Sequence, residues 1–146
     1  MQPEVAEVTE ITEPLREALA RLMPQLSPRL GAPAAGRLEA LLASPSAVLL
    51  EARYRGRIVG VLTLVWYDTP SSRKAWIEDV VVDAAARGCG AGRALVAAAL
   101  ERAAAEGVGR VMLTSAPRRV TARALYRKMG FEEAETNVFV LKMDRK

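Results

Sequence analysis

The sequence predicts an α/β (α+β) fold with a mixed, mostly antiparallel central sheet flanked by helices. Two observations support this fold class. The apolar runs at residues 47–54 and 58–66 are joined by residues 55–57, Arg-Gly-Arg, which is typical of a β-hairpin. Further along, a β-branched run that includes Ile77 and residues 80–82 gives way to a glycine-rich turn and then to helical spacing. Strands and helices in this order form layered α/β domains.

Composition limits the classes of protein to which the chain can belong. With 146 residues and 51% hydrophobic content, residues 1–146 fit one domain that buries roughly two thirds of its unfolded surface. No apolar run is long enough for a membrane span, and the first residues lack the pattern of a signal peptide, so we expect a cytoplasmic protein. Cys89 is the only cysteine and histidine is absent, so we expect no disulfide, no Cys or His metal site and no histidine triad.

The N-terminal part predicts one strand and two helices. Residues 5–9 alternate weakly and suggest a strand, and Thr12 is a suitable N-cap for a helix that Pro24 ends. Residues 24–36 are rich in proline and glycine, which predicts a loop placed to cover a pocket. A short second helix then stops at Ser44-Pro45.

The hairpin is followed by a third strand. Residues 68–74 predict the turn into it, so three antiparallel strands follow one another along the chain. Glu78 and Asp79 are the charges that interrupt its apolar run. Because successive side chains on a strand alternate, we expect these two carboxylates to point to opposite faces of the sheet.

The C-terminal part predicts alternating helices and strands. Gly107 closes a long helix, and residues 110–115 predict a strand. Residues 120–129 carry apolar side chains three and four apart, which predicts a helix capped by Gly130. Residues 138–141 predict a closing strand.

Glycines mark the start of the long helix. Gly88, Gly90 and Gly92 fall where a helix N-terminus offers free N–H groups and a partial positive charge to an anion. This turn therefore predicts a phosphate cradle. A dinucleotide-binding fingerprint would need glycine at Arg93, and a P-loop would need lysine there and Ser or Thr at Ala94, so the spacing fits neither motif.

The cradle and the strand before it resemble those of a known family. The run Arg87-Gly88-Cys89-Gly90-Ala91-Gly92 is similar to the acyl-coenzyme A pyrophosphate loop of the GNAT superfamily of N-acetyltransferases, and the preceding Ile-Glu-Asp-Val-Val-Val-Asp resembles its central strand. The resemblance implies a GNAT-like fold, acetyl-coenzyme A as co-substrate and no metal. The coenzyme contacts that it implies are Val80, Val82, Arg87, Gly88, Gly90, Ala91, Gly92 and Arg93.

A second resemblance lies in the helix predicted over residues 120–129. Its Leu125-Tyr126, followed by Gly130-Phe131, is similar to a later GNAT motif in which the tyrosine faces the coenzyme's sulfur. The resemblance implies that Tyr126 is the acid that protonates the departing thiolate. One departure is Arg119, seven residues before the tyrosine, where the family often has asparagine.

Glu78 and Asp79 are the two candidates for the base, and the same resemblance favours Glu78. The resemblance also implies that a strand N–H near Val80 meets the oxyanion. Direct proton transfer from an alkylammonium to a glutamate would cost about 8 kcal/mol at their usual pKa values, so we expect the proton to leave through water. Protonation of a thiolate by a tyrosine such as Tyr126 costs only about 2 kcal/mol. Asp79 is expected to tie down a neighbouring loop, and Cys89 has no histidine partner that would make it a nucleophile.

The expected partners are acetyl-coenzyme A and a small-molecule or peptide amine. We expect the loop at residues 24–36 to shape the amine pocket together with the aromatic residues Trp66, Tyr67 and Trp76. The residue types do not identify the amine, and a homodimer is left open.

Two other function classes are weighed against this hypothesis. A non-catalytic acyl-coenzyme A sensor would need the cradle, but not Glu78 and Tyr126 together. A nucleic-acid-binding domain would use the positive charge of residues 87–146. This range holds 12 of the 21 basic residues of the chain and 6 of its 17 acidic residues. Aromatic residues, on which bases stack, make up only 5% of the chain, so we expect neither nucleic acid nor membrane as a partner.

Overall fold

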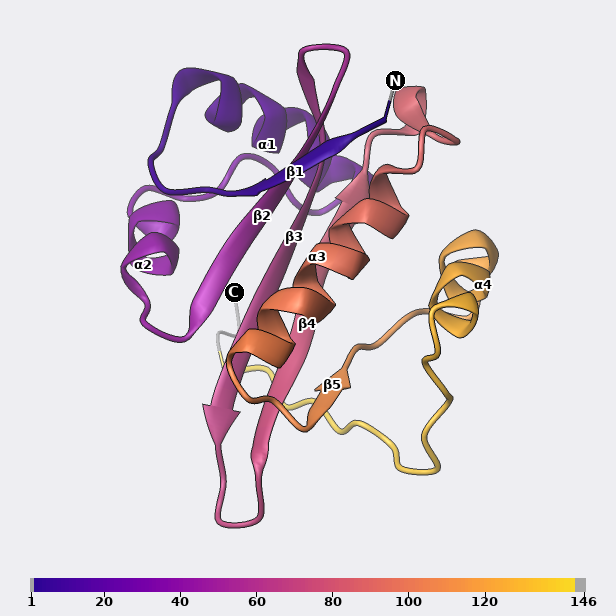
Figure 1. Ribbon diagram of the computed structural model, residues 1–146. Helices are drawn as coiled ribbons and strands as arrows, with labels where there is room; N and C mark the ends of the chain where they lie inside the picture. The colour runs from indigo at the N-terminus through magenta and orange to yellow at the C-terminus, as the bar shows by residue number, and fades with distance from the viewer. Residues whose placement is uncertain (1, 144–146) are drawn as a thin grey trace. The chain divides into compact units, whose positions relative to one another are not determined.

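The computed structural model describes residues 2–143 and has two compact units, Met1–Leu113 and Thr114–Lys146. The first unit contains a five-stranded sheet in the order β1-β2-β3-β4-β5 (Figure 1). Its strands are β1 (Glu4–Glu7), β2 (Ala47–Tyr54), β3 (Arg57–Asp68), β4 (Arg73–Val82) and β5 (Arg110–Met112). β1 to β4 pair antiparallel and β5 runs parallel to β4, which confirms the predicted mixed, mostly antiparallel sheet.

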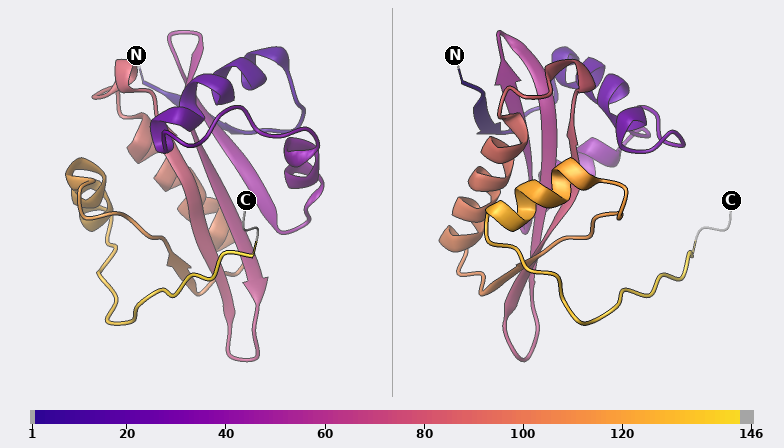
Figure 2. Two further views of the ribbon diagram at one scale, coloured as in Figure 1. Left: turned by 180° about the vertical axis from the view of Figure 1, so that it is seen from behind. Right: turned by 90° about the vertical axis from the view of Figure 1, so that its right-hand side faces the viewer.

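Helices cover both faces of this sheet (Figure 2). α1 (Glu13–Leu26) and α2 (Arg37–Ala43) lie on one face, and α3 (Ala91–Ala105) lies on the other. Residues directly opposite each other in paired strands point to the same face, so Val61 and Val81 share a face. Both pack against the leucines of α1, namely Leu15, Leu19 and Leu22.

The α3 face is packed closely enough to disfavour a side chain at Gly60 of β3. A Cβ on Gly60 would stand 3.1 Å from Cδ1 of Leu95, which belongs to α3. Leu95 is 0% exposed, and full burial of a leucine side chain is worth about 1.5–3 kcal/mol. Apolar packing on both faces therefore fixes the position of β4 between its helices.

The structure confirms the predicted helices of the N-terminal part and moves some limits. The Thr12 hydroxyl accepts a 3.3 Å hydrogen bond from the Leu15 N–H, as an N-cap does. The prediction that Pro24 ends this helix was wrong, because α1 continues to Leu26. Pro24 stands in the last turn, where the loss of one backbone hydrogen bond interrupts little further helix.

The second unit contains α4 (Val120–Lys128), close to its predicted limits, and Gly130 follows at φ +101°. Two strand predictions were wrong. β5 ends at Met112 rather than at residue 115, and residues 138–141 form no strand within the part of the chain that the structure describes. Their side chains are 62–92% exposed. An apolar run forms a strand only where a neighbouring strand pairs with its backbone. The local sequence pattern does not show whether such a partner strand exists.

Candidate active site

The predicted cradle forms a single turn between β4 and α3. Gly88 has φ +87° and Gly90, the N-cap of α3, has φ +92°. Side chains other than glycine rarely adopt these left-handed angles, so both positions require glycine. No heavy atom lies within 4 Å of a Cβ built on either residue, so the turn leaves open space beside its backbone.

The turn presents several backbone donors together. The Cys89 N–H bonds to the Ala86 carbonyl at 3.3 Å and the Ala94 N–H bonds to the Gly90 carbonyl at 3.0 Å. Within the described chain, five N–H groups of this turn have no protein acceptor: those of Gly88, Gly90, Ala91, Gly92 and Arg93. With the partial positive charge of the helix N-terminus, such donors are suited to an anion.

The side chains around the cradle divide into an exposed and a buried set. Arg87 and Arg93 are exposed, which leaves both guanidinium groups available to an anion. Ala91 is 1% exposed, so its methyl group packs in the core at the start of the helix. The structure thus brings together all six cradle residues that the sequence predicts.

Asp83 anchors the turn that leads into the cradle, a role that the sequence interpretation missed. It caps a short 3₁₀ helix, Ala84–Ala86, by accepting a 3.1 Å hydrogen bond from the Ala85 N–H. Two side chains of α1 reach the same carboxylate: Arg21 Nε at 3.0 Å and Gln25 Nε2 at 3.3 Å. An aspartate directly after a strand and before an alanine run is an N-cap signal that could have revealed it.

The pKa of the Asp83 carboxyl reflects these contacts. Burial alone would raise this pKa, but the hydrogen bonds from Ala85, Gln25 and Arg21 outweigh burial and bring it below its ordinary value. The carboxylate therefore stays ionised at neutral pH. The predicted loop-tying role of Asp79 belongs to Asp83 instead, since no hydrogen bond or ion pair links the Asp79 carboxylate to other described residues.

One edge of β4 is open beside the cradle. β5 pairs only with residues 74–76 of β4, so within the first unit no strand lies along the outer edge from Ile77 to Val82. The Asp83 N–H bonds inward to the Val59 carbonyl at 2.7 Å. Because backbone groups alternate along a regular strand, Val82 directs its own to the open edge. Val80 lies along the same edge segment, next to the irregular part of β4.

A β-bulge interrupts β4 at the predicted base. Val81 pairs with Val61 and Glu78 with Thr63, so β4 has one residue more than β3 in this interval. Asp79 adopts φ +49°, a left-handed conformation. The regular alternation expected to send Glu78 and Asp79 to opposite faces is therefore broken, and both side chains are exposed.

The electrostatics of Glu78 suit a proton acceptor. Partial desolvation raises the pKa of its carboxyl, and the neighbouring Asp79 charge raises it further. No ion pair engages Glu78 among the described residues. A carboxylate of raised pKa without a basic partner is a stronger base than an ordinary glutamate.

The aromatic residues expected at the amine pocket separate onto two faces. Trp66 is 6% exposed, and Arg102 of α3 stacks over its ring at 5.3 Å, so it belongs to the opposite side of the sheet from Glu78. Trp76 lies two residues before Glu78 on β4, and its Nε1 donates a 3.0 Å hydrogen bond to the Tyr67 hydroxyl. Trp66 therefore lies on the other face of the sheet, while Tyr67 and Trp76 share the face of Glu78.

Tyr126 lies on α4 in the second unit. Its ring makes an edge contact with Phe131, with centroids 5.9 Å apart, and the Phe131 N–H bonds to its carbonyl at 3.0 Å. Burial raises the pKa of the Tyr126 hydroxyl, while the charge of Arg119 opposes that rise. Tyr126 is therefore protonated at neutral pH and able to donate a proton.

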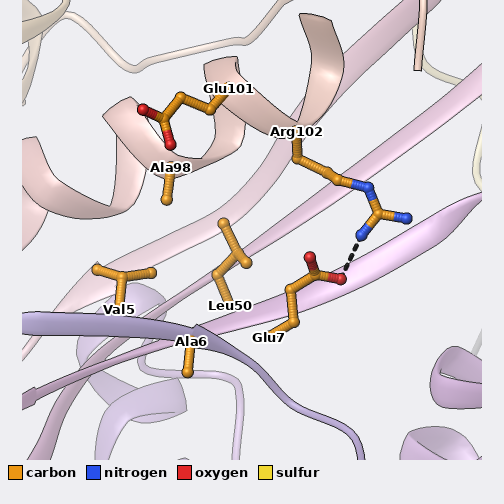
Figure 3. Close-up of a pocket in the computed structure, with 7 residues that line it drawn as sticks. All are labelled: Val5, Ala6, Glu7, Leu50, Ala98, Glu101 and Arg102. Atoms are coloured by element: carbon orange, nitrogen blue, oxygen red, sulfur yellow. Dashed lines mark hydrogen bonds and ion pairs between the residues drawn. The ribbon is translucent and has the colours of Figure 1, made fainter. Parts of the chain in front are cut away.

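Two hollows in the first unit lie away from the cradle. One, of about 310 Å³, lies between β1, β2 and α3, where Glu7 and Arg102 form an ion pair at its rim (Figure 3). The other, of about 320 Å³, lies between α1 and the β2–β3 hairpin and is lined by Arg21, Arg53 and Arg57. Neither is lined by Glu78 or a cradle residue.

The described residues offer neither a metal-binding cluster nor a membrane-spanning helix. No group of three or more His, Cys, Asp and Glu side chains in residues 2–143 is arranged to hold a metal ion. In the same part of the chain, no helix has the length and apolar content needed to cross a bilayer.

Comparisons with known proteins give a consistent result. The sequence profile of the family described as "Acetyltransferase (GNAT) family" matches residues 12–131. No curated protein matches the chain. Among solved structures, a transcriptional regulator from Bacillus halodurans C-125 is 25% identical, with TM-score 0.79 over 97% of this chain and 100% of that one.

Two further solved structures share the fold. An acetyltransferase from Trypanosoma brucei is 24% identical, with TM-score 0.77 over 97% of this chain and 100% of that one. AAC(6')-Iy, in complex with the bisubstrate analogue CoA-S-monomethyl-acetylneamine, is 21% identical, with TM-score 0.77 over 97% of this chain and 99% of that one.

Proposed function

Because the chain belongs to the acetyltransferase (GNAT) family, we propose that it transfers an acetyl group from acetyl-coenzyme A directly to a primary amine. The observation that carries the proposal is the continuity of two features of the first unit. The turn at residues 87–93 offers unpaired N–H groups, and the open edge of β4 leads from it toward Glu78. A ligand with phosphates at one end and an acyl group at the other fits this arrangement, with its phosphates at the turn and its acyl group near Glu78.

The coenzyme is proposed to bind through the backbone more than through side chains. The five N–H groups of the cradle would hold its pyrophosphate, with Arg87 and Arg93 adding charge. Val80 and Val82 would pair with the amides of its pantetheine arm, as one strand edge pairs with another. A backbone N–H near Val80 would stabilise the oxyanion of the tetrahedral intermediate.

Glu78 is proposed to receive the proton of the amine through water. The amine nitrogen attacks the thioester carbonyl, the C–N bond forms and the nitrogen loses a proton. The raised pKa of Glu78 narrows the gap to the amine, and its negative charge with that of Asp79 attracts the ammonium form. The intermediate then collapses and the C–S bond breaks.

Tyr126 is proposed to protonate the departing thiolate. Its hydroxyl donates the proton and is reprotonated from solvent, so atoms and charge balance over the cycle. This role rests on the resemblance of Leu125-Tyr126 and Gly130-Phe131 to the family motif and on the protonated state of the hydroxyl. The raised pKa makes Tyr126 a weaker acid than free tyrosine, so its donation is coupled to breakage of the C–S bond.

We propose that residues 1–146 form one catalytic domain and that it acts in the cytoplasm. Its reaction uses no metal, and its acceptor is a small-molecule or peptide amine. The test is calorimetric titration with acetyl-coenzyme A, followed by a thiol-release assay with a panel of primary amines. Binding with amine-dependent thiol release supports the enzyme. Binding without release for any amine would favour the non-catalytic sensor, and absence of binding would overturn both.

A further inference from the structure

The face of the sheet that carries Glu78 has a recognition surface beyond the reacting groups. Trp76 pairs with Val65 and Glu78 with Thr63, so their side chains share the face that α1 and α2 cover farther along. Tyr67 lies on the same face, because its hydroxyl accepts the hydrogen bond from Trp76 Nε1 at 3.0 Å. Tyr67 is 42% exposed and Trp76 is partly exposed, so an aromatic surface remains accessible there.

The order of side chains along β4 gives this surface a direction. Glu78 and Trp76 are two residues apart, which is about 7 Å along a strand. Trp76 lies on the side of Glu78 away from the cradle, so it faces the part of the acceptor that extends beyond the amine. Because Nε1 is engaged by Tyr67, the indole offers an orientated ring face rather than a hydrogen-bond donor.

The charge of Lys74 decides whether the indole ring of Trp76 binds an ammonium group or an aromatic ring. A ring face attracts a second ammonium group as well as an aromatic ring. Lys74 pairs with Tyr67 and is two residues from Trp76 on the same face, so its ammonium opposes a second cation over the indole. The carboxylates of Glu78 and Asp79 favour a cation only at the other end.

We propose that the acceptor is a primary amine joined by a short alkyl linker to an aromatic ring, and that Trp76, held by Tyr67, is the residue that selects it. This inference rests on the proposed function, since the acetyl group must arrive near Glu78. The ammonium lies beside Glu78 and Asp79, and the ring packs on the indole of Trp76. Lys74 disfavours polyamines.

The experiment compares 2-phenylethylamine with 2-cyclohexylethylamine and spermidine. The two monoamines have the same carbon skeleton size and differ in aromaticity, so their kcat/KM ratio isolates the ring contact. We expect the wild-type protein to favour the aromatic amine about 3- to 10-fold. Trp76→Leu should reduce this ratio to about 1, and Trp76→Phe should restore most of it. Tyr54→Leu, on the distant β2–β3 hairpin, is the matched control and should keep the wild-type ratio.

The same amines are titrated by calorimetry into the protein saturated with coenzyme A, which needs no transfer. A preference for the aromatic amine in binding, lost in Trp76→Leu, supports the inference even if no acetyl transfer occurs, in which case only the proposed function fails. A preference for spermidine, or a ratio that Trp76→Leu leaves unchanged, overturns it. Lys74→Gln should raise spermidine affinity relative to wild type, and an unchanged affinity would count against the role of Lys74.

Discussion

Arg21 in α1 and Asp83, directly after β4, are joined by a hydrogen bond of 3.0 Å, although they lie 62 positions apart in the sequence. Arg21 also donates a 2.6 Å hydrogen bond to the Ile58 carbonyl. Gln25 adds a second link, since its amide oxygen accepts the Ala84 N–H at 2.8 Å. The first helix therefore holds the turn from which the cradle begins.

Loss of this link should affect both stability and coenzyme binding. Asp83→Ala leaves the Arg21 guanidinium without its charged partner and the 3₁₀ helix without its cap, so we expect the free energy of unfolding to fall by about 2–3 kcal/mol. Affinity for acetyl-coenzyme A should fall as well, because the cradle loses its anchor. Chemical denaturation and calorimetry measure the two effects.

Asp68→Ala is the control for Asp83→Ala, because the Asp68 ion pair with Arg73 is exposed and should contribute little to either quantity. An Asp83→Ala protein with wild-type stability and affinity would contradict the anchoring role.

Replacement of Gly90 separates strain from charge. At φ +92° a side chain strains the backbone, and Asn and Asp can both cap α3 from this position, so Gly90→Asn and Gly90→Asp should change stability similarly. Only Gly90→Asp brings a negative charge to the phosphate position, and we expect it to weaken acetyl-coenzyme A binding well beyond the effect of asparagine. Equal affinities of the two variants, measured by calorimetry, would place the phosphates elsewhere.

Glu78→Gln should reduce turnover and raise stability at neutral pH. A carboxyl whose folded pKa is raised contributes stability below its unfolded pKa, and that stability is lost as the pH rises through the folded pKa. The variant should therefore match the wild-type melting temperature below about pH 4 and exceed it at pH 7. Single-turnover acetylation should slow by roughly 10²- to 10⁴-fold.

Glu101→Gln, an exposed glutamate on α3, controls for the removal of a surface charge and should keep the wild-type rate. A Glu78→Gln rate equal to wild type from pH 6 to 10 would remove Glu78 as the base.

Tyr126→Phe tests the proposed acid. The change removes one oxygen and keeps the ring contact with Phe131, so stability and coenzyme affinity should hardly change while the chemical step slows by roughly 10²- to 10⁴-fold. Single-turnover rates avoid masking by slow product release. Phe131→Leu disturbs the same contact without removing the hydroxyl and should lower stability more than the rate. The reverse pattern would make Tyr126 a packing residue.

Local sequence patterns correctly predicted the structural elements that depend only on residues close together in the sequence. The Thr12 cap, the 55–57 hairpin turn and the glycines at the start of α3 depend on a few neighbouring side chains, and the structure has them where the sequence predicts. The six cradle residues come together for the same reason, since all of them lie within residues 87–93.

Features that depend on distant partners could not be predicted. The bulge at Asp79 exists only in relation to β3, and the Asp83 anchor needs Arg21 and Gln25 from a helix formed much earlier in the chain. The faces of Trp66 and Trp76 follow from strand register, which a one-residue change would reverse. Residues 138–141 have the composition of a strand, but composition does not supply a neighbour.

The ion pair between Glu7 and Arg102 connects residues that the ribosome makes 95 positions apart. At about 5–20 residues per second, α3 reaches the nascent β1 roughly 5–20 s after β1 has been synthesised. Until then Leu50, which is 2% exposed in the finished fold, has no helix over it. The first half of the chain therefore has an uncovered apolar sheet face during this interval, and slower translation through α3 would lengthen the time for which that face stays exposed to solvent.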